Sequence, residues 1–160
     1  MSELPAGWAE VPLGELGDWR GGGTPSKQNS SFWTDGDIPW VSPKDMKLKL
    51  ISDSEDHITA SAVEASATQV VPRHSVLIVT RSGILRHSLP VAVNTREVTI
   101  NQDLKALSPG KGLDVNFVAR QLDARAQNIL SECAKSGTTV DSIDFERLKA
   151  LKFKVAPLAE

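Results

Sequence analysis

The clearest apolar stretch of the chain is SVLIVTR, residues 75–81, where aliphatic and β-branched residues follow one another without a break. VPRH precedes this stretch and SG follows it, so turn-forming residues bound it on both sides. A short apolar run between turn signals predicts a buried strand. LPVAVNT, residues 89–95, and REVTINQDLKAL, residues 96–107, predict two further strands. The short turn between them, near residues 94–97, predicts that these two pair with each other antiparallel.

A helical period follows between residues 114 and 135, in DVNFVARQLDARAQNILSECAK. Its apolar residues recur three or four positions apart, which is typical of an amphipathic helix with one buried face. Gly137 predicts the stop of this helix. DFERLKAL, residues 144–151, predicts a second, shorter helix with Asp144 as its N-cap. The residues expected on the buried face of the long helix are Val118, Leu122, Ala126, Ile129, Leu130 and Cys133.

Shorter strands are expected at both ends of the chain and near residue 40. WAEVPLGEL, residues 8–16, predicts a strand that leads into a helical turn, and KFKVAPLAE, residues 152–160, predicts a last strand. DIPWV, residues 37–41, predicts a strand with Trp40 in the core. Because proline cannot donate a ladder hydrogen bond, Pro39 predicts that this strand lies at an edge.

Polar segments separate these elements. Ser61 and Glu64 have the S-x-x-E spacing of a capping box, which predicts a short helix through about residue 67. Gly, Ser, Asn and Pro dominate residues 20–37, and SPKDMKLKL, residues 42–50, is basic, so both are expected to be loops. The elements together predict an α+β fold, with a mixed, mostly antiparallel sheet, a few helices and long polar loops.

Composition adds limits to this picture. The 160 residues fit one domain, residues 1–160, and 40% hydrophobic with 24% charged residues is ordinary for a globular protein. The single cysteine, Cys133, allows no internal disulfide and favours a reducing cytoplasm, with the thiol in the core. The longest aliphatic run, Val76–Val79, is far too short to span a bilayer, so no membrane association is expected. A net charge of −2 argues against indiscriminate nucleic-acid binding but permits a local basic face.

The glycine-rich stretch RGGGTPSK, residues 20–27, invites comparison with a phosphate-binding loop. That motif requires G-x-x-x-x-G-K-[ST] between a strand and a helix. When Gly21 is aligned as the first glycine, Ser26 and Gln28 occupy the positions of the second glycine and the magnesium-binding hydroxyl. We therefore interpret this stretch as a structural loop, in which glycines permit positive φ and which can also face DNA.

Other catalytic chemistry is poorly supported. DIPW slightly resembles the D-P-P-[YF] motif of amino-methyltransferases that act on DNA bases, but Ile38 replaces a proline and no F-x-G cofactor motif is present. His57, His74 and His87 share no metal-ligand spacing, and no C-x-x-C occurs. No G-x-S-x-G elbow is present. We expect no catalytic residue, no cofactor and no metal.

A basic, polar set of side chains remains on the loops. Lys44, Lys47 and Lys49 alternate and would face one way if that segment were extended. Arg81, Ser82, Arg86 and His87 lie at SGIL, and a further turn holds Lys135, Ser136, Thr138 and Thr139. Arg, Lys, Ser and Thr contact DNA phosphates and base edges. On residue type alone, these positions can equally be scattered, solvated side chains.

The order of motifs changes that balance. GGTPS, GDIPWVSPKDM, SVLIVTRSG, TINQDLKAL and SGTTVDSIDFERLKALKFKVAPLAE together resemble a target recognition domain of a type I restriction-modification specificity subunit. The resemblance covers essentially the whole chain. APLAE resembles the family's P-P-L-x-E-Q, with Ala156 in place of the first proline; there the family's conserved spacer helix would begin, and the chain stops at Glu160. Where the family often has a G-x-I-G turn, this chain has Arg86, His87 and Ser88, so no base contact carries over.

The resemblance implies a non-catalytic protein that reads one half of a bipartite target in double-stranded DNA. It implies methyltransferase (modification) subunits, restriction and motor subunits, and a second recognition domain as partners. The phosphate-anchoring candidates are Lys27, Lys44, Lys47 and Lys135. The candidates for base-edge contacts are Arg81, Ser82, Arg86, His87, Thr138 and Thr139.

Two alternatives stay open at this point. The first is a protein-interaction module of the same family that docks methyltransferase subunits without reading DNA. A concave basic strip would favour DNA reading over this module. The second is an enzyme, which tight binding of S-adenosylmethionine would support.

Overall fold

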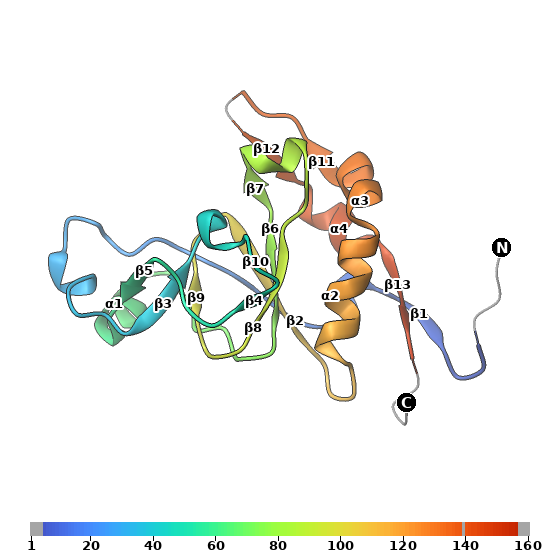
Figure 1. Ribbon diagram of the computed structural model, residues 1–160, viewed down its shortest axis with the longest axis horizontal. Coiled ribbons are helices and arrows are strands. Elements are labelled where there is room, and N and C mark those ends of the chain that lie inside the picture. Colours follow the sequence, from blue (N-terminus) through green and yellow to red (C-terminus); the bar gives the residue numbers. More distant parts are fainter. Residues whose placement is uncertain (1–4, 139, 157–160) are drawn as a thin grey trace.

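The computed structural model describes residues 5–138 and 140–156, and its centre is a five-stranded sheet (Figure 1). The strand order is β2-β10-β6-β8-β4. All four residues of β6 are completely buried, as the unbroken apolar run predicts, and β10 pairs with it antiparallel. The strand bounds are Gly17–Gly21 for β2, Leu50–Ile51 for β4, Val76–Val79 for β6, Val91–Asn94 for β8 and Leu104–Pro109 for β10.

The predicted long helix is two consecutive helices, α2 (Val115–Ala124) and α3 (Ala126–Cys133). Arg125 leaves the helical conformation between them, and its guanidinium donates a hydrogen bond to the Lys152 carbonyl oxygen. The predicted face is confirmed: Val118, Leu122, Ile129 and Cys133 are buried, and Ala126 and Leu130 pack partly buried against the same core.

Gly137 is not the helix stop that the sequence predicts. α3 ends at Cys133 because Ala134–Lys135, β11, pairs with Asp141–Ile143, β12. β12 also pairs with Arg81–Ser82, β7, and the three strands form a small sheet. Figure 1 shows this sheet rising from one end of the central sheet, beside the turn η4 (Gly83–Arg86).

A smaller lobe lies beside the central sheet, on the side away from α2 and α3 (Figure 1). It holds Asp56–Ile58 (β5), Ile38–Val41 (β3) and Thr99–Ile100 (β9), in the order β5-β3-β9. Trp40 is buried as expected, and its indole Nε1 donates to the Gly23 carbonyl oxygen. The expected edge position is wrong, because β3 is the middle strand. The ladder with β9 begins at Trp40, one residue past Pro39, so no bond of that ladder requires a donor from Pro39.

The predicted hairpin between residues 89–95 and 96–107 is also absent. β8 pairs with β6 and β4, whereas β9 crosses to β3 in the other sheet. The buried Asn94 side chain fixes this crossing. Its amide donates to the carbonyl oxygens of Pro72 and Arg96, and its oxygen accepts from the backbone of Ser75. A buried side chain that satisfies three backbone groups holds the chain in a bend rather than a tight turn.

The helix after β5, α1 (Ala60–Ala65), begins two residues earlier than its capping-box prediction. Thr59, not Ser61, is the N-cap, and its hydroxyl accepts from the Ala62 backbone N–H. Ser61 instead lies 2.9 Å from the Thr59 hydroxyl.

The first and last strands, Ala9–Pro12 (β1) and Lys152–Val155 (β13), form a two-stranded ribbon beside α2 (Figure 1). The 3₁₀ turn Leu13–Glu15 (η1) follows β1, and α4 (Phe145–Ala150) precedes β13 with Asp144 as its N-cap, as predicted. The remaining short helical turns are Ser30–Phe32 (η2) and Pro43–Asp45 (η3).

The expected fold class is confirmed. Only the pairs β3 with β9 and β4 with β8 are parallel among the strand pairs of the described residues. The helices found within residues 5–138 and 140–156 are too short or too polar to cross a membrane.

Candidate nucleic-acid interface

Two adjoining hollows bring together predicted DNA-contacting side chains from distant segments. The central hollow, about 530 Å³, lies between η3 and η4 and is lined by Lys44, Lys47 and Ser82, among others. The upper hollow, about 450 Å³, holds Arg81 beside Gln102 and Asp103. Both hollows are lined by Pro43 and Ser82, so they share a wall.

A third, smaller hollow, the side hollow of about 320 Å³, is lined by Lys27, Trp33, Trp40 and Asp56 of the smaller lobe. The Lys44 ammonium contacts Asp56, which connects the side hollow to the central one. The structure thus places Lys27, Lys44, Lys47, Arg81 and Ser82 along neighbouring hollows.

The prediction that Lys44, Lys47 and Lys49 share one face of an extended segment is wrong. Lys44 lies in the 3₁₀ turn η3, and its ammonium pairs with Glu55 at 2.6 Å and with Asp56 at 2.8 Å. Lys49 pairs with Asp123 of α2 at 2.9 Å. The turn breaks the alternation of side chains that an extended strand would give, yet all three lysines still line the central hollow.

Arg86 and His87 lie at the end of η4, which Ser82 caps through a hydrogen bond from the Ile84 backbone N–H to its hydroxyl. The Arg86 Nε is 3.7 Å from Asp141, a carboxylate only 14% exposed. The exposed His87 uses its backbone to bond Ile84 and Gln127. Arg86 therefore already has an anionic partner within the fold.

The small sheet β11-β12-β7 decides which side chains share a face. Arg81 and Lys135 both lie opposite Ser142, so their side chains project from the same face of the sheet. Ser82 lies opposite Asp141, on the reverse face. Lys135 is 3.7 Å from Asp144. Thr138 is exposed in the loop beyond β11, and Thr139 lies outside the described residues.

Two polar residues that line the upper hollow were missed at the level of sequence. Gln102 and Asp103 form the turn between β9 and β10, and the Gln102 side-chain oxygen accepts from the Thr24 hydroxyl. The Asp103 backbone N–H is bonded to the Asn101 side chain, which fixes the turn. The sequence does indicate a turn here, because Asn-Gln-Asp directly follows the strand TI. Turn composition alone, however, does not show that this turn lies beside Arg81.

The glycine-rich stretch RGGGTPSK is structural, for a reason other than positive φ. In the described residues only Gly7 and Gly112 are glycines with positive φ. A Cβ on Gly22 would instead collide with the carbonyl oxygens of Ile100 and Asn101. The next carbonyl, that of Gly23, accepts bonds from Trp40 and Thr68. The stretch therefore joins the smaller lobe to the central sheet by close backbone approach.

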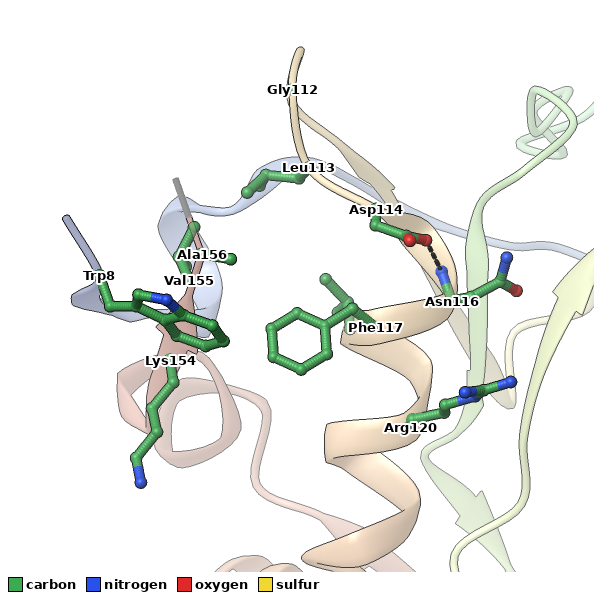
Figure 2. Close-up of a pocket in the computed structure, with 11 residues that line it drawn as sticks. Trp8, Gly112, Leu113, Asp114, Asn116, Phe117, Arg120, Lys154, Val155 and Ala156 are labelled. Atoms are coloured by element: carbon green, nitrogen blue, oxygen red, sulfur yellow. Dashed lines mark hydrogen bonds between the residues drawn. The ribbon is translucent and has the colours of Figure 1, made fainter. Parts of the chain in front are cut away.

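A different kind of hollow, about 500 Å³, lies between α2 and the terminal ribbon (Figure 2). Its centre is apolar, with the Trp8 and Phe117 rings edge to face at 5.7 Å. Figure 2 shows the Lys154 ammonium and the Arg120 guanidinium extending away from the ring pair. With no polar groups converging on its centre, this hollow does not resemble a site for a polyanion.

Metal and thiol chemistry find no support in the described residues. No group of three or more His, Cys, Asp or Glu side chains there is arranged to hold a metal ion. His57 bonds Asp53 at 2.6 Å, and that bond lowers the pKa of the Asp53 carboxyl. Cys133 is buried, and desolvation raises the pKa of its thiol, which favours the unreactive protonated form.

The pKa of the Asp144 carboxyl is lowered from its ordinary 3.8, first by the hydrogen bond from the Arg147 backbone N–H and then by the charge of Lys135. The cap thus stabilises the fold above the unfolded-state pKa and loses its effect as the pH falls through the lower folded-state pKa. We expect Lys135→Gln to keep most of this depression, measured by NMR titration of the carboxyl carbon. A return to the ordinary pKa in Lys135→Gln would show instead that the lysine is the main cause.

Residues 5–160 match the type I restriction modification DNA specificity domain, and the chain belongs to this family. It is 44% identical over 148 residues to the type I restriction enzyme EcoR124I/EcoR124II specificity subunit of Escherichia coli, covering 92% of this chain and 37% of that protein. It is 25% identical over 155 residues to the MjaIX specificity subunit of Methanocaldococcus jannaschii, covering 95% of this chain and 35% of that protein. The chain thus spans little more than a third of these relatives.

Solved structures agree on the fold. The HsdS subunit from Thermoanaerobacter tengcongensis superposes with a TM-score of 0.68 at 21% identity, over 99% of this chain and 35% of that one. The type I restriction-modification S subunit from M. genitalium gives a TM-score of 0.62 at 15% identity, over 96% and 36% of the two chains.

Proposed function

We propose that this chain recognises a specific sequence in double-stranded DNA and reads one half of a bipartite target for a type I restriction-modification complex. Membership of the DNA specificity domain family supports this proposal. The observation that carries it is the convergence of polar side chains from three separate segments on two adjoining hollows. These side chains are Lys47, Arg81, Ser82, Gln102 and Asp103.

Each residue type suits a different part of the duplex. Lys27 and Lys47, for which the described residues offer no ion-pair partner, would anchor phosphates. Arg81 would contact a base edge, because an arginine fork matches guanine O6 and N7. Arg86 and Lys135 would first have to leave Asp141 and Asp144. His87, Thr138 and Thr139 remain candidates for base contacts.

The proposed partners follow from the relatives. The two curated proteins are specificity subunits of type I restriction enzymes. We propose methyltransferase and restriction subunits as partners of the assembled protein, with a second recognition domain for the other half of the target. The chain itself would supply recognition rather than catalysis.

Selection of bound duplexes from a random-sequence pool tests the proposal directly. Wild-type protein is expected to enrich one short motif. Arg81→Ala should lose the preference for one base of this motif, which corresponds to about 1–3 kcal/mol of discrimination against the wrong base. Lys47→Ala should weaken binding to every duplex and reduce the salt slope by about 1, because one phosphate contact is lost. Fluorescence anisotropy over a range of salt concentrations measures both effects.

Lys111→Ala is the matched control, since it removes the same charge from the exposed turn before α2, which lines none of the three hollows. It should leave both the motif and the salt slope unchanged. Enrichment of no motif by the wild-type chain, or an Arg81→Ala variant with an unaltered motif, would contradict the proposed reading role.

A further inference from the structure

Two carboxylates, those of Glu55 and Asp56, lie on the surface proposed to bind phosphates, where basic side chains would be expected. Glu55 and Asp56 lie at the junction of the central and side hollows, where both contact the single ammonium of Lys44. These bonds raise the pKa of Lys44, so it stays protonated. One cation against two anions leaves a net charge of −1 at this point, between Lys27 on one side and Lys47 on the other.

The backbone that carries the two carboxylates is held in place without help from the lysine. One oxygen of Asp45 accepts from the Glu55 backbone N–H at 3.0 Å, and the other accepts from the Ser42 backbone at 2.9 Å. Asp56 begins β5 and pairs in register with Trp40 of β3. The backbone of Glu55 and Asp56 is therefore fixed to η3 and β3, whereas Lys44 is a long, half-exposed side chain on a flexible stem.

Stability does not explain this arrangement. Exposed ion pairs contribute little to folding, because water screens the charges and two side chains lose their freedom. The Glu55 side chain is 68% exposed, and its backbone, rather than its carboxylate, makes the structural bond to Asp45. The two carboxylates therefore contribute little to the stability of the fold, and their main effect is on the charge of the surface.

We propose that Glu55 and Asp56 are specificity-determining residues that hold Lys44 off the DNA backbone and repel phosphates, so that the chain binds arbitrary duplexes weakly. The inference rests on the proposed DNA-reading function. Non-specific affinity comes from lysines and arginines that displace counterions from phosphates. Sequestering one cation and adding a repulsive charge lowers that affinity for every sequence, whereas base contacts elsewhere reward only the correct one.

The test uses the paired variant Glu55→Gln with Asp56→Asn, which keeps shape and removes both charges, and a duplex of arbitrary sequence as probe. We expect affinity for this duplex to rise several-fold. The slope of log affinity against log salt concentration should steepen by about 1, because the released Lys44 reaches a phosphate. Adding Lys44→Gln to this variant should return the slope to its wild-type value.

The control variant, Glu10→Gln with Glu132→Gln, changes the net charge equally at exposed sites on β1 and α3. An equal rise in affinity for both variants would mean that only overall charge matters, and would overturn the inference. An unchanged slope in Glu55→Gln/Asp56→Asn would do the same. Should that variant fail to fold, Glu55→Gln alone is expected to show a smaller rise in affinity for the arbitrary duplex. No rise in affinity would refute the inference.

The two proposals fail in different ways. If no chain binds any duplex, even at low salt, the proposed function fails and the inference falls with it. If the wild-type chain binds and selects a motif while these variants behave like the control, only the inference is overturned.

Discussion

Replacing Phe153 with alanine is expected to lower the free energy of unfolding by about 3–5 kcal/mol, the range found when a buried phenylalanine is truncated. Phe153 lies on β13, opposite Val11 of β1, and is completely buried. The Arg125 guanidinium lies 4.6 Å from the centre of its ring, at the break between α2 and α3. The ring therefore joins the terminal ribbon to the helices, and the loss should be evident in urea unfolding.

Phe117→Ala is the matched control for this change. Phe117 is only partly buried, and its ring contact is the edge-to-face pair with Trp8. Such a pair contributes about 0.5–1.5 kcal/mol beyond its buried area, so a markedly smaller loss is expected. Phe153→Leu, which keeps most of the apolar volume, covers the case in which Phe153→Ala does not fold. Equal losses for Phe117→Ala and Phe153→Ala would contradict the assigned packing.

The elements of this fold that depend on local sequence could be predicted, because their signals lie within the segment itself. The apolar run of β6, the apolar stripe of α2 and α3, and the Asp144 cap are all of this kind. Strand partners are not local properties. Neither the central position of β3 nor the crossing of β9 to the other sheet could be inferred, because both depend on the pairing of Trp40 with Thr99, 59 positions further along the chain.

The same distinction applies to the candidate site. Residue type and loop position made Lys27, Lys47 and Arg81 candidates for DNA contact, but ion pairing depends on which carboxylates the fold brings near. Arg86 lies near Asp141, 55 positions further along the chain, and nothing in the local sequence predicts this partner. Gln102 was missed for a similar reason, since only the fold places it beside Arg81 in the upper hollow. Cationic residues in loops are therefore candidates for DNA contact until their anionic neighbours are known.

RGGGTPSK shows how a motif can be structural through steric crowding, and this leads to the second large effect. Gly22→Ala is expected to lower the free energy of unfolding by about 3 kcal/mol, the upper part of the range for overpacking. The new methyl group would meet two carbonyl oxygens, of Ile100 and Asn101, and neither can move without displacing the strand β9. Urea unfolding measures the loss.

The neighbouring glycine provides the control. A Cβ on Gly21 would meet only the terminal nitrogen of Lys105, at 3.2 Å, and that flexible side chain can move aside. Gly21→Ala should therefore be neutral or slightly stabilising, because alanine reduces the freedom of the unfolded chain. If instead the two alanine variants unfolded at the same urea concentration, the close approach at Gly22 would not be what joins the two lobes. Gly22 adjoins Gly23, whose carbonyl oxygen accepts the hydrogen bond from the Trp40 indole. Displacement of this backbone in Gly22→Ala should therefore also expose the Trp40 indole to water and red-shift its fluorescence.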